Sequence, residues 1–124
     1  MMRQSAFVLL AMLCVPHAQA APRADYEGIW ARTEAECRDR DGPNSRTLIE
    51  MGGKDGPLFD RYENHCRIER VTGGAGSHEL TLRCFEFWEE FRKNGVSNRA
   101  TARLVQKSAR SLRIDGESYT RCRR

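Results

Sequence analysis

Short runs of alternating apolar and polar residues, separated by glycine-rich turns, constrain the fold of this chain most. Runs of this kind cover residues 26–31, 47–51, 59–71, 78–84, 99–105, 111–114 and 118–122. Alternation with a period of two places every second side chain on one face of a strand. The pattern predicts an all-β fold in which about seven strands form one antiparallel meander that closes into a small barrel. A two-sheet sandwich with one short helix at residues 85–93 is the alternative.

Residues 1–20 have the composition of a secretory signal peptide. Arg3 provides the positive start, residues 6–15 provide a short apolar stretch, and Ala18-Gln19-Ala20 provides a cleavage motif. A transmembrane helix needs about 20 apolar residues, so we expect no transmembrane segment after cleavage. We therefore expect cleavage after Ala20, a single β-rich domain at residues 21–124, and a periplasmic or secreted protein.

Removal of the signal peptide with Cys14 would leave an even number of cysteines: Cys37, Cys66, Cys84 and Cys122. Four cysteines in a small exported domain indicate two disulfides. Zinc is not expected, because no two cysteines have the close spacing of a zinc knuckle. We favour Cys37–Cys66 with Cys84–Cys122, since directly opposed strand neighbours suit disulfide geometry less often. A hairpin centred near Ala75 would instead place Cys66 opposite Cys84 and leave Cys37 to pair with Cys122.

The segment at residues 85–91 is rich in aromatic residues and has two interpretations. Phe85, Trp88 and Phe91 have helical spacing, and Asn94-Gly95 would end such a helix. Asn-Gly is also a strong hairpin signal, and extended segments lie on both sides, so we favour a strand. The exposed part of this segment is a candidate binding surface, with four possible binding residues: Phe85, Phe87, Trp88 and Phe91.

Charge is divided unevenly along the sequence. Residues 21–91 hold ten basic and fifteen acidic residues, whereas residues 92–124 hold ten basic and two acidic residues. A basic segment suits an acidic partner, and the candidates are an envelope protein or an acidic envelope polymer that bears phosphate or carboxylate. Nucleic acid is not expected, because no recognition-helix pattern or stacking platform accompanies the basic residues. These residues are Arg99, Arg103, Lys107, Arg110, Arg113, Arg121, Arg123 and Arg124.

The sequence contains no convincing catalytic or metal-binding motif, so we predict no enzymatic activity, no cofactor and no metal. His65 and His78 are expected on the surface. Asp39, Asp41 and Glu50 match three positions of an EF-hand loop, but the intervening ligand and glycine positions do not match. We interpret this loop as a turn.

Three glutamates interleave with the aromatic residues of the ambiguous segment: Glu86, Glu89 and Glu90. A pair of carboxyl groups in a cleft, one with a raised pKa, would suit hydrolysis of a glycan. An enzyme that acts on envelope polymers therefore stays open as the least favoured function.

Gly28 and Trp30 form a G-x-W motif in the first predicted strand. The motif resembles the signature of calycin-type barrels such as lipocalins. This resemblance implies that Trp30 closes one end of the barrel and that Arg121 packs across it. The chain is much shorter than a lipocalin and shows no C-terminal helix, so the resemblance does not imply a cavity of lipocalin size.

The overall plan also resembles small exported proteins of unknown function from Gram-negative bacteria. Periplasmic lysozyme inhibitors are similar in size, export and disulfide use, although their inhibitory loop motif is not found here. The favoured function is an exported, non-enzymatic binding or inhibitory module. A small-ligand carrier of calycin type is the alternative.

Overall fold

The computed structural model describes Cys14, residues 25–39 and residues 46–123. The rest of the predicted signal peptide, including its cleavage motif, lies outside the described residues, as does Asp41 of the predicted turn. Cys14 is exposed and is the free cysteine of the described part. Among the described residues, no helix has the length and apolar character needed to cross a membrane.

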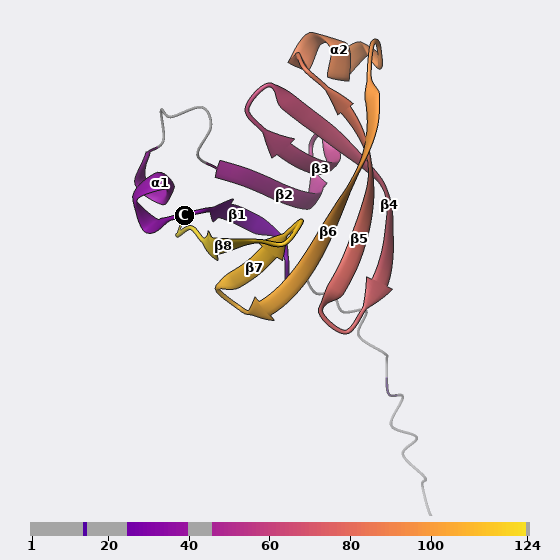
Figure 1. Cartoon of the computed structure of the whole chain (residues 1–124). Helices are drawn as coiled ribbons and strands as arrows, with labels where there is room; N and C mark the ends of the chain where they lie inside the picture. Colours follow the sequence, from indigo (N-terminus) through magenta and orange to yellow (C-terminus); the bar gives the residue numbers. More distant parts are fainter. Residues whose placement is uncertain (1–13, 15–24, 40–45, 124) are drawn as a thin grey trace, which may run out of the picture.

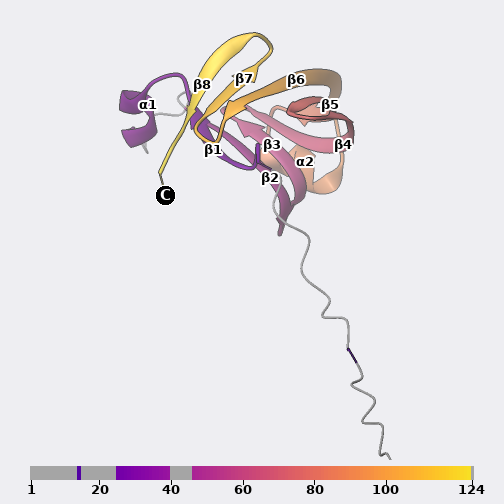
Figure 2. The ribbon, with the colours of Figure 1, turned by 90° about the horizontal axis from the view of Figure 1, so that it is seen from below.

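The described chain forms a closed antiparallel barrel in which each strand pairs with the next and β1 pairs with β8 (Figures 1 and 2). The fold class predicted from the sequence is confirmed, with eight strands where about seven were expected. The strands are β1 (Gly28–Ala31), β2 (Arg46–Gly53), β3 (Gly56–Arg61), β4 (Asn64–Gly74), β5 (Ser77–Phe85), β6 (Asn98–Ser108), β7 (Ser111–Ile114) and β8 (Glu117–Arg121). The helices are α1 (Glu34–Arg38) and α2 (Trp88–Lys93).

The additional strand arises because the segment at residues 59–71 reverses at Tyr62 and Glu63. Arg61 pairs with Asn64 across this turn, and Glu63 has a φ of 50°, in the left-handed region that tight turns use. The prediction of one continuous strand was wrong here. Apolar alternation continues on both sides of the turn and conceals it in the sequence.

Helix α2 replaces the strand that we favoured at residues 85–91, so that prediction was wrong and the helical interpretation was right. Acidic Glu89 and Glu90 lie in its first turn and Lys93 in its last, an arrangement that suits the helix dipole. Asn94 ends the helix in the left-handed conformation with a φ of 53°. The helical conformation places the Phe91 side chain in a buried position.

Helix α1 was not predicted, although its start has a sequence signal. Thr33 is the N-cap, and its Oγ1 accepts a hydrogen bond from the Glu36 backbone N–H at 3.1 Å. Thr33 and Glu36 have the spacing of a capping box. In the structure the Glu36 carboxylate accepts from the backbone N–H of Arg32, one residue before the cap.

Inward-facing side chains fill the barrel interior. An eight-stranded barrel is just wide enough for side chains to pack across it, and each fully buried large apolar side chain contributes about 1.5–3 kcal/mol. The interior cluster consists of Tyr26, Trp30, Ile49, Phe59, Cys66, Ile68, Leu80, Leu82, Cys84, Ala102, Leu104, Leu112 and Ile114.

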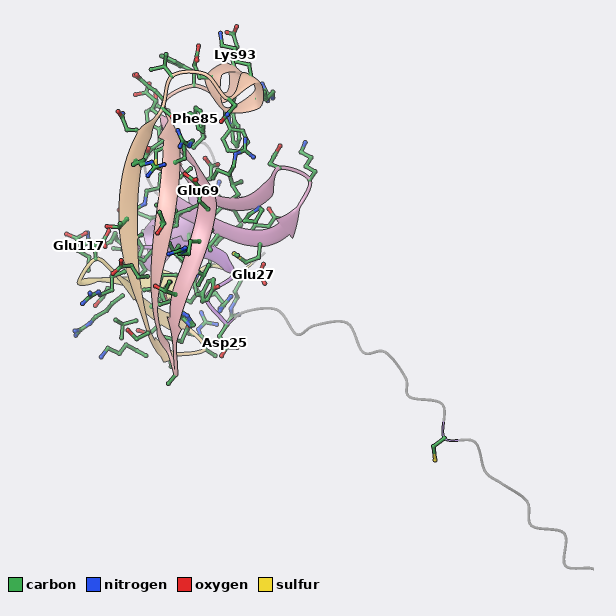
Figure 3. All side chains as sticks on the ribbon, turned by 90° about the vertical axis from the view of Figure 1, so that its right-hand side faces the viewer. Asp25, Glu27, Glu69, Phe85, Lys93 and Glu117 are labelled. Carbon is green, nitrogen blue, oxygen red and sulfur yellow. A yellow bond between two sulfur atoms is a disulfide. The ribbon has the colours of Figure 1, made fainter. Side chains whose placement is uncertain are left out.

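The two ends of the barrel differ. The β2–β3, β4–β5 and β6–β7 turns lie at one end, which we call the turn end. The β3–β4 and β7–β8 turns lie at the other end, together with the connection that contains α2; we call it the helical end. Figure 3 shows the two ends apart, with Lys93 of α2 at the helical end and Asp25 at the turn end.

Arg121 holds the turn end together. Its guanidinium lies 4.4 Å from the ring centroid of Trp30, which is fully buried. Nη1 donates to the Glu27 carbonyl at 2.5 Å, and Nε donates to the Ala109 carbonyl at 2.7 Å. Glycine suits position 28, because its φ of 144° is one that other residues rarely adopt and a Cβ there would lie 2.5 Å from Nη1. This packing is what the calycin resemblance implies for these residues, while the family relationship itself stays a prediction.

Two disulfides cross-link the barrel, and the pairing that we favoured was wrong. Cys37 of α1 bonds to Cys122 after β8, and Cys66 of β4 bonds to Cys84 of β5. Cys66 and Cys84 are direct cross-strand partners with a Cα–Cα distance of 4.0 Å. Opposed residues of an antiparallel pair come this close at the positions without mutual hydrogen bonds, so direct opposition permits the bond.

Removal of Cys37–Cys122 should destabilise the protein more than removal of Cys66–Cys84. The two bridges close loops of 85 and 18 residues. Chain entropy alone predicts losses of about 4.5 and about 3 kcal/mol respectively. Urea denaturation of the Cys37→Ser/Cys122→Ser and Cys66→Ser/Cys84→Ser variants measures the difference. An equal or larger loss in the second variant would contradict this prediction.

Candidate functional site

Three large apolar side chains are exposed among the described residues, and all three belong to the helical end. Tyr62, Phe87 and Val96 are 49%, 57% and 81% exposed. Tyr62 lies in the β3–β4 turn, Phe87 precedes α2 and Val96 lies between α2 and β6. We call these residues the apolar rim. Single exposed apolar residues are common on protein surfaces, and it is the shared location of these three that makes this end the candidate site.

A second hydrophobic cluster, outside the barrel, holds helix α2 next to Phe87 of the rim. Phe85 and Phe91 are 1% and 3% exposed, and their ring centroids lie 5.5 Å apart. They pack with Leu58 and with the partly buried Leu48 and Trp88. Phe85 and Phe91, which the sequence offered as possible binding residues, are therefore buried as supports for α2. Phe87 is the most exposed aromatic residue of that segment.

Trp88 stacks on His65, which is partly buried and not on the surface as we expected. The two ring centroids lie 4.0 Å apart with an interplanar angle of 21°. The His65 side chain is 12% exposed, and its Nδ1 lies 2.5 Å from Oδ1 of Asp60. Burial raises the pKa of the Asp60 carboxyl, although its hydrogen bond to His65 acts in the opposite direction. These three residues fasten α2 to β3 and β4.

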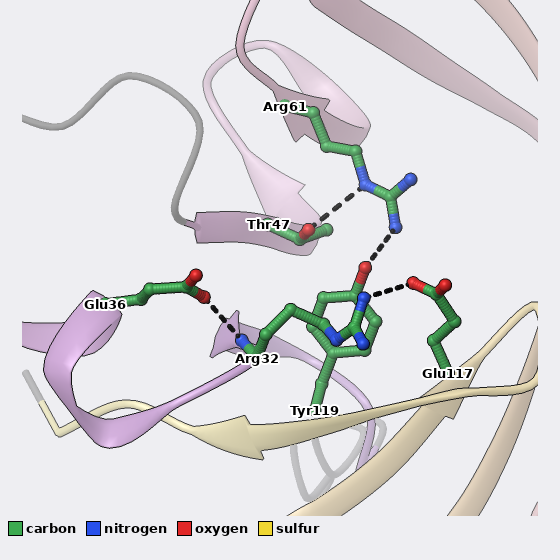
Figure 4. A network of polar contacts seen from close by, with 6 residues as sticks. All are labelled: Arg32, Glu36, Thr47, Arg61, Glu117 and Tyr119. Atoms are coloured by element: carbon green, nitrogen blue, oxygen red, sulfur yellow. Dashed lines mark hydrogen bonds and ion pairs between the residues drawn. The ribbon is translucent and has the colours of Figure 1, made fainter.

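A polar network spans the helical end between β3, β2 and β8 (Figure 4). Arg61 donates through Nε to Oγ1 of Thr47 at 3.1 Å and through Nη2 to the Tyr119 hydroxyl at 3.3 Å. Its guanidinium also lies 4.9 Å from the ring centroid of Phe59. Arg61 therefore lies over one end of the packed interior and connects β3 to β2 and β8.

Arg32 extends this network towards solvent. It forms an ion pair with Glu117, and its guanidinium lies 5.6 Å from the ring centroid of Tyr119. Both charged side chains are about half exposed, so this pair contributes little stability and leaves polar groups accessible to solvent. This network could not be predicted from the sequence, because Arg61, Thr47 and Tyr119 are brought together only by closure of the barrel.

The three glutamates of the aromatic segment lie in surroundings that do not favour a catalytic acid. Glu86 and Glu89 are exposed. Glu90 accepts a hydrogen bond from the backbone N–H of Val96 at 2.8 Å and pairs with Lys93 at 3.0 Å. These contacts lower the pKa of Glu90, whereas a catalytic acid would need a raised pKa.

The remaining candidate residues lie away from this site. Gly28, Trp30 and Arg121 belong to the turn end, where His78 packs edge-on against Tyr26 with ring centroids 4.9 Å apart. Within the described ranges, no group of three or more histidine, cysteine, aspartate or glutamate residues is arranged to hold a metal ion.

Comparison of the chain with models of protein families, with curated proteins and with solved structures gives no match. Function is therefore inferred from the geometry of the helical end.

The free energy of unfolding should depend on pH in part through the Asp60 carboxyl. Burial raises its folded-state pKa above the ordinary value of 3.8. Stability from this group is then complete below the unfolded pKa and is lost as the pH rises through the folded pKa. Urea denaturation at increasing pH, starting near pH 3, should show this loss in the wild type and not in Asp60→Asn. A variant with the wild-type pH dependence would contradict the assignment.

Proposed function

We propose that the protein is an exported binding module, without enzymatic activity, that docks a partner protein on the apolar rim at its helical end. The observation that carries this proposal is that the exposed large apolar side chains of the described residues, Tyr62, Phe87 and Val96, all lie on connections at one end. Aromatic side chains supply much of the energy at protein interfaces, because they bury a large area with few rotatable bonds.

The support beneath the rim also favours binding. Phe87 directly precedes α2, which is fastened by buried Phe91 and by the stack of Trp88 on His65. A surface held in one conformation before contact loses less entropy on association. The same property suits an inhibitor that presents a rigid loop to its target.

The packed interior favours a binding module over a carrier. Trp30, Leu80, Leu104 and Leu112 are fully buried inside the barrel, and Arg61 and Arg121 stand over its two ends. A ligand pocket in a small barrel instead needs a hollow lined by side chains around one occupant. The lowered pKa of Glu90 likewise gives no support to the enzyme hypothesis.

Export is part of the proposal and rests on residues 1–20 together with the two disulfides. Disulfides persist in oxidising compartments such as the periplasm and the extracellular space. Expression of the full chain with its N-terminal segment should yield a protein outside the cytoplasm that begins at Ala21, as measured by intact mass and N-terminal sequencing. Recovery of the uncleaved chain in the cytoplasm would contradict export.

Site-specific photo-crosslinking tests the docking surface. A photoreactive phenylalanine analogue replaces Phe87 in one variant and Lys54 in a control. Lys54 is exposed in the turn between β2 and β3, at the opposite end of the barrel. We expect a discrete protein adduct from position 87 and none of that mass from position 54, because only the helical end contacts the partner.

The adduct identifies the partner, and binding of the purified pair then measures the contribution of the rim. Phe87→Ser should weaken binding by about tenfold, since truncation of an aromatic interface residue costs more than about 1 kcal/mol. Lys54→Ser should leave binding unchanged. Equal adducts from both positions, or wild-type binding by Phe87→Ser, would contradict docking on the rim.

A further inference from the structure

Three arginines lie directly opposite one another on three adjacent strands. Arg67 of β4 pairs in register with Arg83 of β5, and Arg83 pairs in register with Arg99 of β6. Their neighbours Ile68 and Leu82 are buried in the interior, so the three arginines share the outer face of the barrel. We call them the arginine row. Adjacent strands lie about 4.8 Å apart, so the row places three positive charges at short, regular intervals.

The row is not neutralised within the fold. Like charges directly opposite on neighbouring strands are destabilising. Arg83 pairs with one carboxylate, that of Glu69, at 3.2 Å. Within the described part of the chain, exposed Arg99 makes neither an ion pair nor a side-chain hydrogen bond. A bound anion would therefore remove a repulsion that the folded protein retains.

Arg67 and Arg83 are held in place by contacts that leave some of their N–H donors free. The Arg67 guanidinium stacks 4.2 Å from the ring centroid of Phe91 and donates to the Phe91 carbonyl at 3.2 Å. Arg83 donates through Nε to Glu69 and through Nη1 to Oγ of Ser97 at 3.1 Å. Each guanidinium has five N–H donors, so several remain for a ligand. Planar guanidinium groups match the geometry of phosphate and carboxylate oxygens.

Further basic residues continue the positive surface beyond the row. On β6, Arg103 lies on the same face as Arg99, and on β7 exposed Arg113 pairs in register with outward Val105. Arg103 forms an ion pair with Glu79 at 3.6 Å, while Arg113 has no ion pair among the described residues. The outer face of β4, β5 and β6 is turned to the viewer in Figure 3, around Glu69. Its extent across several strands suits an extended ligand better than a single small anion.

We propose that the arginine row binds a linear polyanion whose repeating charged groups are phosphates or carboxylates. The polymer crosses β4, β5 and β6 on the outer wall, at a surface separate from the apolar rim. The row fixes the position of the polymer, and the basic residues of β6 and β7 extend the contact by charge attraction.

Binding of two defined polymers tests the proposal. Inorganic polyphosphate supplies phosphate groups and polygalacturonate supplies carboxylates, and titration calorimetry measures their affinity for the folded, disulfide-bonded protein. We expect binding of at least one polymer at about 0.15 M salt, with an affinity that falls as salt rises. Preference for one polymer identifies the anionic group, and absence of binding by both overturns the proposal.

A matched pair of variants separates the row from general charge attraction. Arg99→Gln and Arg38→Gln each remove one positive charge from an exposed arginine, in β6 and in α1 respectively. Helix α1 lies across the barrel from the row (Figure 1). Arg99→Gln should weaken binding roughly threefold to fivefold, the effect of one exposed ion pair, and Arg38→Gln by much less. Equal losses in the two variants would overturn the proposal.

Arg83→Lys tests whether the planar guanidinium matters. The substitution keeps the charge and removes the fork that can hold two oxygens at once. We expect weaker binding than in the wild type, with a melting temperature that shows the variant to be folded. Wild-type affinity in a folded Arg83→Lys protein would show that the row acts only as diffuse charge and would overturn the proposal.

Discussion

Pairing of β1 with β8 is the interaction on which the rest of the structure depends. It is short, with Trp30 opposite Arg121 and Ala31 opposite Thr120. The seam is extended by a backbone hydrogen bond of 2.7 Å from Cys122 to Ile29. Without closure, both edge strands would expose unpaired backbone groups, and the interior would lie open on one side.

The longer-range disulfide and the two end arginines all reinforce that closure. Cys37–Cys122 joins the segment after β1 to the segment after β8, directly beside the seam. Arg121 ties β8 to the chain before β1 at the turn end, and Arg61 ties β3 to β2 and β8 at the helical end. A short seam thus becomes stable because covalent and charge-assisted contacts surround it. The interior is occupied by side chains of the protein itself, and both proposed binding surfaces lie on the outside of the barrel.

The fold was largely accessible from the sequence, because alternation and turn residues are local signals. Helix α2 was misassigned because its three aromatic residues satisfy a helical period while the flanking segments are extended. Only the tertiary environment decides: Leu58 of β3 and Phe85 of β5 provide an apolar surface outside the barrel for Phe91. The disulfide pairing depends on strand register. The hairpin centred near Ala75 places Cys66 opposite Cys84, and this is the pairing that the structure has.

The candidate site was less accessible, because its residues come from separate connections. Tyr62 and Val96 have no distinctive pattern in the sequence, and their significance arises from barrel closure at one end. The arginine row is equally invisible before the register is known, since residues 67, 83 and 99 are far apart in the chain. The uneven charge of the sequence indicated a basic surface without indicating which strands would carry it.

Helix α2 gives the two proposed surfaces a common support. At its start, Phe87 belongs to the apolar rim, while its last turn contains Phe91, on which Arg67 of the arginine row stacks. Between them, Trp88 fixes the helix to His65 of β4. A six-residue helix is too short to be stable alone, so these aromatic contacts determine whether it forms. The aromatic residues at 85–91 therefore support both proposed surfaces, and only one of them, Phe87, is extensively exposed.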